Sequence, residues 1–387
     1  MVLRMASAHF VSDAYSNLYT PLLPALIPRL GLSLTAAGTL AMLFQLATSV
    51  SQLGFGHLAD RWRPRVLLVA GPIVSVLVLS LIGMAWSPTT LAIVLIVGGL
   101  GGAAFHPSAA AVVHRMGGSH RGFAMAFHIT GGSVGYSLAP ILFAPFVDRF
   151  GLAWTPALAI PGLVLLGLIL ARVPPVRPFG GDGAGGFQAL RPYAGPLFLL
   201  YLIVVLRTVT SMGFATFFPV MLTRRGWSVG EAGAAVSMYL FAAGMGGLIG
   251  GPLADRLGSR RVIAASLAMA VPFLALAPAL DGWLLLMAMA LGGFFLQSTL
   301  PVNVTLAQQI APVSAATVSS LMMGFAWGTG GLSAPLVGAS ADRFGIESTL
   351  MAMAFVPLLG VVCALALPRD HQRQQIAVAE TARYIGT

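Results

Sequence analysis

Long apolar segments, separated by short polar ones, follow one another along nearly the whole chain of 387 residues. A helix needs about 20 apolar residues to cross a bilayer, and twelve segments reach roughly that length. The predicted spans are 5–28, 35–58, 65–86, 89–114, 121–147, 152–172, 196–223, 229–254, 261–280, 283–309, 315–341 and 347–367. The pattern therefore predicts an all-α membrane protein with 12 transmembrane helices.

The first predicted span is interrupted by polar residues, namely His9, Asp13, Ser16, Asn17 and Thr20. At 3.6 residues per turn these five side chains fall on one stripe of the helix. A charged group at mid-membrane depth costs about 2.5–3.5 kcal/mol on insertion scales, so Asp13 is expected to serve a function there. The stripe predicts that water or substrate lies along one side of this span.

The composition agrees with a membrane protein and excludes several other classes. The chain is 57% hydrophobic and 8% charged, with a mean hydropathy of +0.89, values that no soluble domain of this size shows. Because the chain has no lysine, it has no phosphate-binding loop of the Gly-x-x-x-x-Gly-Lys type. Nothing predicts an enzyme or a cofactor, and an ion gradient is expected to supply the energy. The single cysteine excludes an intrachain disulfide.

The net charge of +10 comes from arginines whose placement indicates a topology. With the N-terminus inside, fifteen arginines fall on the cytoplasmic side of the predicted spans, five fall outside, and Arg207 alone lies within a span. This asymmetry follows the positive-inside rule and predicts cytoplasmic N- and C-termini in a bacterial cytoplasmic membrane. The charge is thus topogenic, and no nucleic-acid partner is expected.

The sequence repeats itself at an interval of about 195 residues. Gly56–Arg61 matches Gly251–Arg256, and Asp148–Gly151 matches Asp342–Gly345. A second repeat is nested within the first: the Asp-Arg pairs that follow the second span of each three-span unit lie 88 residues apart in the first half and 87 in the second. Since three is odd, successive units lie upside down in the bilayer.

Two parallel halves, each made of two inverted three-helix units, form the architecture known as the major facilitator fold. Between the halves lies a segment rich in proline and glycine, which indicates a flexible cytoplasmic linker. The predicted divisions are a first bundle at 1–173, a linker at 174–194, a second bundle at 195–368 and a cytoplasmic tail at 369–387.

Over its full length the chain resembles the major facilitator superfamily. The most specific evidence is the signature Gly-x-Leu-Ala-Asp-Arg-x-Gly-x-Arg-Arg, which is complete in the second half from Gly251 to Arg261. The first copy departs at Arg63 and Pro64. The resemblance implies a cytoplasmic gate that latches the two bundles. The residues implied in this gate are Asp60, Arg61, Arg65, Asp255, Arg256 and Arg260.

Two further stretches are similar to the fosmidomycin-resistance branch of this superfamily. One is His9-x-x-x-Asp13 at the start of the first span, and the other is Ala104–Pro107 followed by the glycine-rich run Gly131–Pro140. This resemblance implies drug efflux by proton antiport.

Asp13 and His9 are the candidates for proton coupling, because their i, i+4 spacing lets the side chains touch and both groups titrate. Alternatively, Asp13 is a packing residue tied to serine or asparagine. By the repeat offset, Arg207 corresponds to Ser12 and lies at a similar depth. We expect Arg207 either to pair with Asp13 or to hold an anionic substrate; the alternative is an arginine that reaches to an interface.

Other polar residues within the spans are candidates to line a substrate cavity, or else only bond neighbouring helices to each other. They are Asn17, Gln45, Gln52, His106, His128, Gln297 and Asn303. For His106 and His128 a proton relay and an interhelical hydrogen bond remain equal alternatives. The histidine spacing along the chain predicts no metal site.

Together these patterns predict a proton-coupled secondary transporter that exports small drug-like or anionic solutes by rocker-switch alternating access. An uptake symporter for an organic anion or nutrient would use the same groups, and a lipid flippase or a non-transporting membrane sensor are further alternatives. The expected partners are a small-molecule substrate, protons and the lipid bilayer, and the expected state is a monomer.

Overall fold

The structure is a computed structural model that describes residues 1–61, 64–116, 118–171, 173, 187–311, 318–319 and 321–368. Within these ranges the side chains of residues 53, 60, 61, 119, 121, 122 and 187–189 are not described. The described chain is helical, and no strand occurs in it.

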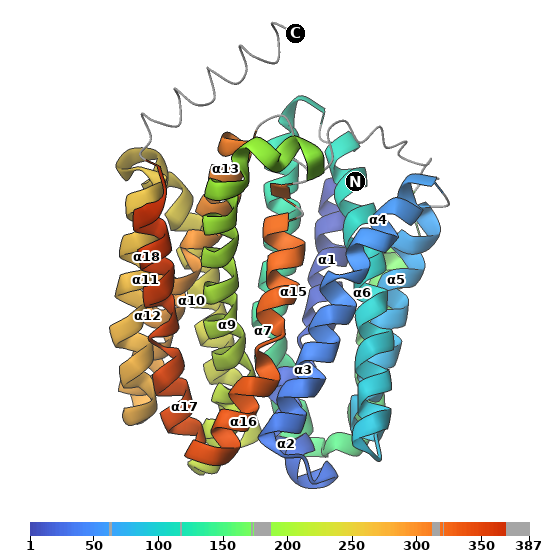
Figure 1. Cartoon of the computed structure of the whole chain (residues 1–387). Coiled ribbons are helices and arrows are strands. Elements are labelled where there is room, and N and C mark those ends of the chain that lie inside the picture. The colour runs from blue at the N-terminus through green and yellow to red at the C-terminus, as the bar shows by residue number, and fades with distance from the viewer. Residues whose placement is uncertain are drawn as a thin grey trace, which may run out of the picture. The chain divides into compact units, whose positions relative to one another are not determined.

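The helices follow the predicted spans closely (Figure 1). In chain order they are α1 (Val2–Ser16), α2 (Tyr19–Leu30), α3 (Leu34–Ser49), α4 (Ser51–Arg61), α5 (Pro64–Ser80), η1 (Leu81–Met84), α6 (Pro88–Met116), η2 (Gly118–His120), α7 (Arg121–Phe150), η3 (Leu152–Leu158), α8 (Ala159–Leu170), η4 (Phe187–Tyr193), α9 (Ala194–Arg224), α10 (Val229–Leu257), α11 (Ser259–Leu276), η5 (Ala277–Ala279), α12 (Gly282–Gln297), α13 (Thr299–Ile310), η7 (Leu321–Phe325), α15 (Ala326–Gly331), α16 (Ala334–Phe344), α17 (Ile346–Met353) and α18 (Val356–Ala366).

Ten of the twelve predicted spans appear in the described residues as helical segments long and apolar enough to cross a membrane. The other two are interrupted. The first breaks between α1 and α2 at Asn17, because the ring of Pro21 clashes with the carbonyl of the residue four positions earlier. The eleventh, of which residues 315–317 and 320 lie outside the described ranges, breaks between α15 and α16 after Gly331, four residues before Pro335. The major facilitator fold predicted from the sequence is thus confirmed, with two spans in pieces.

Contacts divide the chain into two compact units. Unit 1 comprises Met1–Gly181, Met212–Phe241 and Gly331–Thr349, and unit 2 comprises Asp182–Ser211, Ala242–Gly330 and Leu350–Thr387. The domain boundaries expected from the sequence stay a prediction. Most of the linker at 174–194 and all of the tail at 369–387 lie outside the described residues.

In unit 1, α1 lies among α5, α6, α7 and α8, with its largest contact against α7. Glycines of α7 make this contact close: a Cβ at Gly131 would lie 2.5 Å from the carbonyl oxygen of Ala6, and one at Gly135 would overlap the carbonyl oxygen of Phe10. Small residues of this kind let two membrane helices approach backbone to backbone. The candidate functional residues of α1 are therefore held rigidly against α7.

Replacing Gly135 by alanine is expected to lower the free energy of unfolding by about 1–3 kcal/mol, because the new methyl group must push α1 away from α7. The control is Gly167→Ala in α8, where nothing lies within 4 Å of an added Cβ and alanine favours the helix by up to about 1 kcal/mol. Thermal unfolding of the purified variants in detergent measures both effects. Equal melting temperatures would contradict the close packing described here.

Unit 1 also contains a contact between a helix from each half of the sequence, α3 and α16. The carboxylate of Asp342 at the end of α16 accepts hydrogen bonds from the backbone amides of Leu34 (2.9 Å) and Thr35 (2.8 Å) and from the Thr35 hydroxyl (2.7 Å). The Ser33 hydroxyl accepts the amide of Ala36 at 3.0 Å. Three of the four open amides at the start of α3 are thereby satisfied, two of them by another helix.

These contacts make the stability of unit 1 depend on pH. Partial burial opposes the charge of Asp342, but the bonds from Thr35 and Leu34 and the nearby Arg224 outweigh it and hold the pKa of that carboxyl below its ordinary value of 3.8. A pKa lowered by folding means that the carboxylate stabilises the folded state above the ordinary pKa. This contribution is lost as the pH falls through the lowered pKa.

Asp342→Asn is therefore expected to lower the melting temperature at pH 7, by an amount that shrinks as the pH is taken below about 4. The measurement is a series of melting curves of wild type and variant in detergent over this range. Comparing the two proteins at each pH removes the contribution of the other carboxylates. A difference that stays constant into acid would show that the charge of Asp342 contributes nothing.

Candidate functional site

The most unusual group of side chains in unit 1 lies where α1, α6 and α7 meet. His9 Nε2 lies 3.2 Å from one carboxylate oxygen of Asp13, as their spacing predicts. His106 Nε2, from α6, lies 3.6 Å from the other oxygen. His128, from α7, completes the group, with its ring centroid 4.3 Å from that of His9. We call these four residues the Asp13 cluster.

The backbone of α7 fixes the orientation of His9. Its Nδ1 lies 2.9 Å from the carbonyl oxygen of His128, so this nitrogen donates the bond and the other nitrogen, Nε2, faces Asp13. The fully buried ring of Phe105 packs against His9 at 5.9 Å between centroids and separates the cluster from part of the surrounding core. The imidazole is therefore held in one position relative to the carboxylate.

Gly132 makes room for this arrangement. A Cβ at this position would lie 2.5 Å from His9 Nε2 and 2.6 Å from Asp13 Oδ2, so any larger residue would displace the pair. His106 and His128 were candidates for a substrate cavity, a proton relay or an interhelical bond, and the structure brings His106 to Asp13 and His128 to His9. The glycine-rich run in α7 was the sequence signal for this approach, because a helix face without side chains leaves room for the side chains of a neighbouring helix.

The Asp13 cluster is partly accessible and keeps open bonding positions. The exposed fractions of the side chains are 12% for His9, 19% for Asp13 and 24% for His106. Within the described part of the chain, Asp13 Oδ1 and His128 Nδ1 have no hydrogen-bond partner. Asp13 is thus surrounded by histidines, not by the serine or asparagine partners that a packing role predicted.

The cluster also has the dimensions of a metal site. His9, Asp13 and His106 each offer one ligand atom, and these atoms lie within 4.8 Å of one another. Two imidazoles and a carboxylate are a ligand set that zinc accepts. The spacing along the chain did not indicate this set, because His106 belongs to another helix. The absence of a metal remains a prediction.

In unit 2, Arg207 is the largest fully buried side chain, with 1% of its surface exposed. Its guanidinium donates to Gln297 Oε1 and lies 3.5 Å from the Thr208 hydroxyl. It also lies 5.6 Å from the ring centroid of Trp327, where a cation–π interaction stabilises the charge. Gln297 in turn donates to the Ser211 hydroxyl at 2.9 Å, so a chain of polar groups positions the guanidinium.

The remaining cavity candidates divide into two groups. Three bond within or between helices: Asn17 donates to the Tyr136 carbonyl at 2.8 Å, Gln45 to the Ser49 hydroxyl at 2.7 Å, and Gln52 to the Thr48 carbonyl at 2.9 Å. Asn303 in α13 differs, since it is 1% exposed and neither its amide nitrogen nor its oxygen bonds to a described residue. Asn303 is therefore the stronger candidate for contact with water or a polar ligand.

The predicted cytoplasmic gate is described only in part. The side chains of Asp60 and Arg61 lie outside the described residues, and Arg65, Asp255 and Arg256 are exposed. Arg260 donates to the carbonyl oxygen of Leu365, which ties the start of α11 to the end of α18. How the gate residues of the two units relate to each other stays a prediction.

Repeated helical membrane spans with ionisable side chains buried inside them are typical of membrane transport proteins. More particularly, the chain belongs to the Major Facilitator Superfamily, whose family model matches residues 5–199 and 200–383. The matches cover both halves of the chain, in agreement with the internal repeat.

Two curated relatives match nearly the whole chain. One is the uncharacterized MFS-type transporter YfnC of Bacillus subtilis, 28% identical, with 95% of this chain and 92% of the relative covered. The other is the fosmidomycin resistance protein of Escherichia coli, with the same identity and coverage. Among solved structures, the nucleoside transporter NupG has a TM-score of 0.76 at 14% identity, covering 95% of this chain and 98% of that one. The last similarity supports the fold alone.

Proposed function

We propose that the protein is a proton-coupled antiporter that exports small drug-like or anionic solutes. The observation that carries this proposal is the Asp13 cluster, a partly accessible carboxylate in contact with two imidazoles inside a membrane span. Such a group binds and releases one proton without a large structural change. A fixed packing contact has no need of three titratable partners gathered from three helices.

In this mechanism Asp13 carries the coupling proton, and His9 holds the carboxylate and exchanges the proton with it. The distance of 3.2 Å allows direct transfer, and His106 offers a second route at 3.6 Å. Alternating access by rocker-switch motion exposes the cluster to one side of the membrane and then to the other. The proton gradient is the energy source, and no cofactor takes part.

The direction and the substrate class are supported by separate observations. A full-length relative is named for resistance to fosmidomycin, which supports export. In unit 2, the buried Arg207, whose charge lies over the ring of Trp327, offers its guanidinium to an anionic group. We place the monomer in the bacterial cytoplasmic membrane, with both termini in the cytoplasm.

The test is substrate-induced proton movement in everted membrane vesicles with an acidic interior, followed by a pH-sensitive dye. Phosphonates and cationic dyes are added outside, at the face that is cytoplasmic in cells. An antiporter releases internal protons in response to one compound class, and vesicles lacking the protein do not. Proton release only when the compound is loaded inside the vesicles would indicate a symporter instead. No proton release, whether the compound is added outside or loaded inside, would contradict transport of these compounds and favour a lipid substrate or a sensor.

A further inference from the structure

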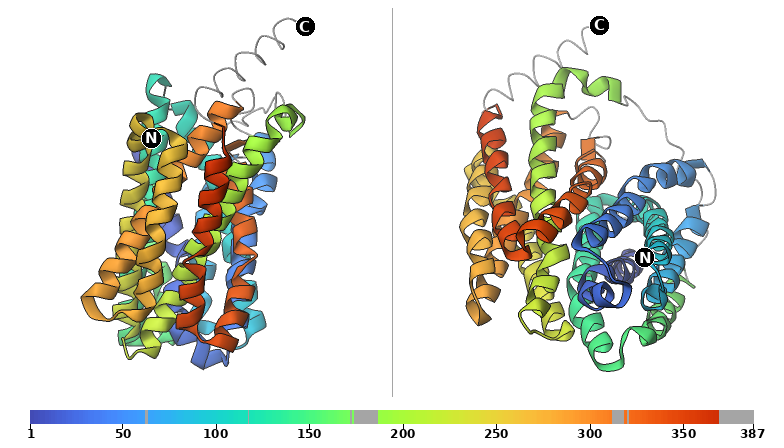
Figure 2. Two further views of the ribbon diagram at one scale, coloured as in Figure 1. Left: turned by 60° about the vertical axis from the view of Figure 1, so that its left-hand side comes forward. Right: turned by 60° about the horizontal axis from the view of Figure 1, so that its bottom comes forward.

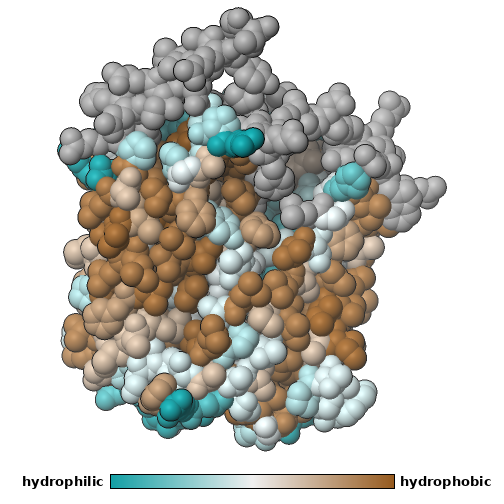
Figure 3. Space-filling model, in the orientation of Figure 1, coloured by the Kyte–Doolittle hydropathy of each residue, from teal (hydrophilic) through white to brown (hydrophobic). Residues whose placement is uncertain are grey.

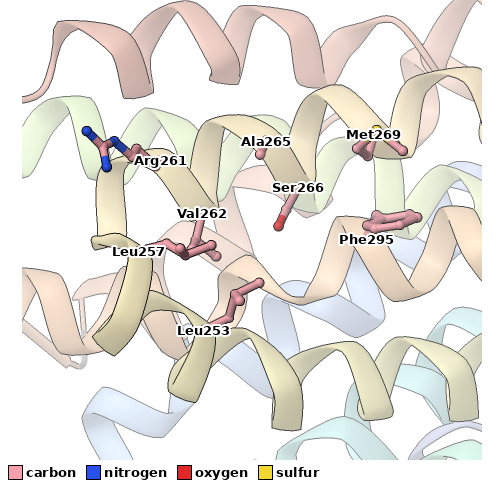
Figure 4. A pocket seen from close by; sticks show the side chains of 8 residues that line it. All are labelled: Leu253, Leu257, Arg261, Val262, Ala265, Ser266, Met269 and Phe295. Carbon is pink, nitrogen blue, oxygen red and sulfur yellow. The ribbon is translucent and has the colours of Figure 1, made fainter.

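Unit 2 contains an apolar groove that the transport mechanism does not use. It has a volume of about 220 Å³ and lies between α10, α11 and α12 (Figure 4). Leu253 and Leu257 form its α10 side, Val262 and Met269 its α11 side, and Phe295 closes one end from α12. At the opposite end lies the guanidinium of Arg261.

The groove is lined mostly by apolar side chains, the kind that contact lipid chains around a membrane protein. Three of its apolar side chains are strongly exposed, at 40% for Leu253, 51% for Leu257 and 46% for Met269. Figures 1 and 2 show α11, α12 and α18 side by side, and Figure 3 shows an apolar surface on this side of the molecule, with hydrophilic residues at both ends. An occupant must therefore be apolar along most of its length.

The charge at one end of the groove restricts what the occupant carries there. Arg261 is exposed, and no hydrogen bond or ion pair with another described residue engages its guanidinium. Two more arginines lie close by in sequence, Arg256 in the last turn of α10 and Arg260 in the first turn of α11, and Asp255 is the one carboxylate among them. The amino-terminal end of α11, which begins at Ser259, adds the positive end of a helix dipole. The combination favours an anionic group.

We propose that this groove binds one acyl chain of an anionic phospholipid, with the phosphate on Arg261. The groove follows α11 from Arg261 to Met269, which corresponds to about 12 Å at 1.5 Å per residue. The hydroxyl of Ser266 is directed between α11 and α10, within reach of a polar linkage below the headgroup (Figure 4). Basic pockets between membrane helices recognise anionic headgroups in this manner.

The site lies beside the second copy of the signature loop, so the lipid belongs to the leaflet on that side of the bilayer. In the proposed orientation this is the cytoplasmic leaflet. The bound lipid would fill the gap between the end of α10 and the start of α11, and so brace the loop that joins them. This inference concerns the lipid-facing side of unit 2 and does not depend on the proposed transport activity.

Native mass spectrometry of the full chain tests the site. Protein in detergent is incubated with dioleoylphosphatidylglycerol or with dioleoylphosphatidylcholine, and the lipids that remain bound are counted. Wild type is expected to retain phosphatidylglycerol about fivefold better, the advantage that one surface arginine gives. Arg261→Gln is expected to remove this preference. Arg29→Gln, which removes an exposed arginine far along the chain in α2, is expected to keep it.

A second variant tests the groove itself. Ala265→Leu places a larger side chain in it and is expected to reduce retention of both lipids. The proposal is overturned if wild type retains the two lipids equally, if Arg261→Gln keeps the preference, or if Ala265→Leu retains both lipids as wild type does. It is also overturned if inorganic phosphate displaces phosphatidylglycerol, because the site would then be one for small anions.

Discussion

Asp13→Asn is expected to abolish substrate-induced proton release from everted vesicles, to the level of vesicles without the protein. Asparagine has nearly the same shape and keeps hydrogen-bonding groups directed at His9 and His106, but it binds no proton in the working pH range. The coupling step is therefore lost while the helices stay packed. Because exchange of labelled for unlabelled substrate moves no net proton, this exchange is expected to persist in the variant.

The matched control is Asp281→Asn, the same chemical change at the start of α12, outside the cluster. This variant is expected to release protons as wild type does. His9→Gln is expected to slow proton release without abolishing it, because His106 remains near Asp13. Proton release at the wild-type rate from Asp13→Asn would show that another group carries the proton. Loss of exchange as well as of proton release would mean that Asp13 supports the structure or binds the substrate.

Arg207→Gln is expected to raise the half-saturating concentration of anionic substrates at least about tenfold, since hydrogen bonds to charged groups contribute about 1.5–3 kcal/mol. Cationic dyes are expected to be transported as well as before, or better. Arg207→Lys keeps the charge but not the planar donor set that bonds Gln297 and lies near Trp327. Its half-saturating concentration for anionic substrates is therefore expected to lie between those of wild type and Arg207→Gln. Transport rates over a concentration series of each compound class measure these effects.

A purely structural role of Arg207 makes a different prediction. Transport of all compound classes by Arg207→Gln would then decrease together, and the melting temperature of the variant would decrease as well. Removing a buried cation often leaves stability unchanged, because the cost of its desolvation disappears with it. Arg149→Gln, at the exposed end of α7, removes the same charge elsewhere and is the control. Unchanged transport of every class by Arg207→Gln would disprove the assignment of the anion site.

The positions of the spans could be predicted from the sequence because hydrocarbon thickness and apolar length are directly related. The two interruptions were missed, although Pro21 and Pro335 were visible, since proline is common in unbroken membrane helices as well. The structure shows which prolines break a helix. For the first span the result is a pair of helices, α1 and α2, each too short to cross the bilayer alone.

Within the candidate site, the contact between His9 and Asp13 could be predicted because it lies within one helix. The approach of His106 and His128 could not, since it depends on how α6 and α7 pack against α1. For other polar residues, the sequence predicted a position in a cavity where the structure shows a bond within one span. Gln45 and Gln52 form bonds with groups four residues away, and a sequence pattern does not distinguish this use from a position facing a cavity.

The break in the first span has a consequence for how the protein is made. The side chain of Asn17 donates to the backbone carbonyl of Tyr136, which is synthesised 119 residues later. The span that contains Asn17 therefore reaches its final place only after α7 has emerged. Until then a shielded site at the insertion machinery, or a temporary neighbour such as α3 or α5, must keep this segment away from the hydrocarbon.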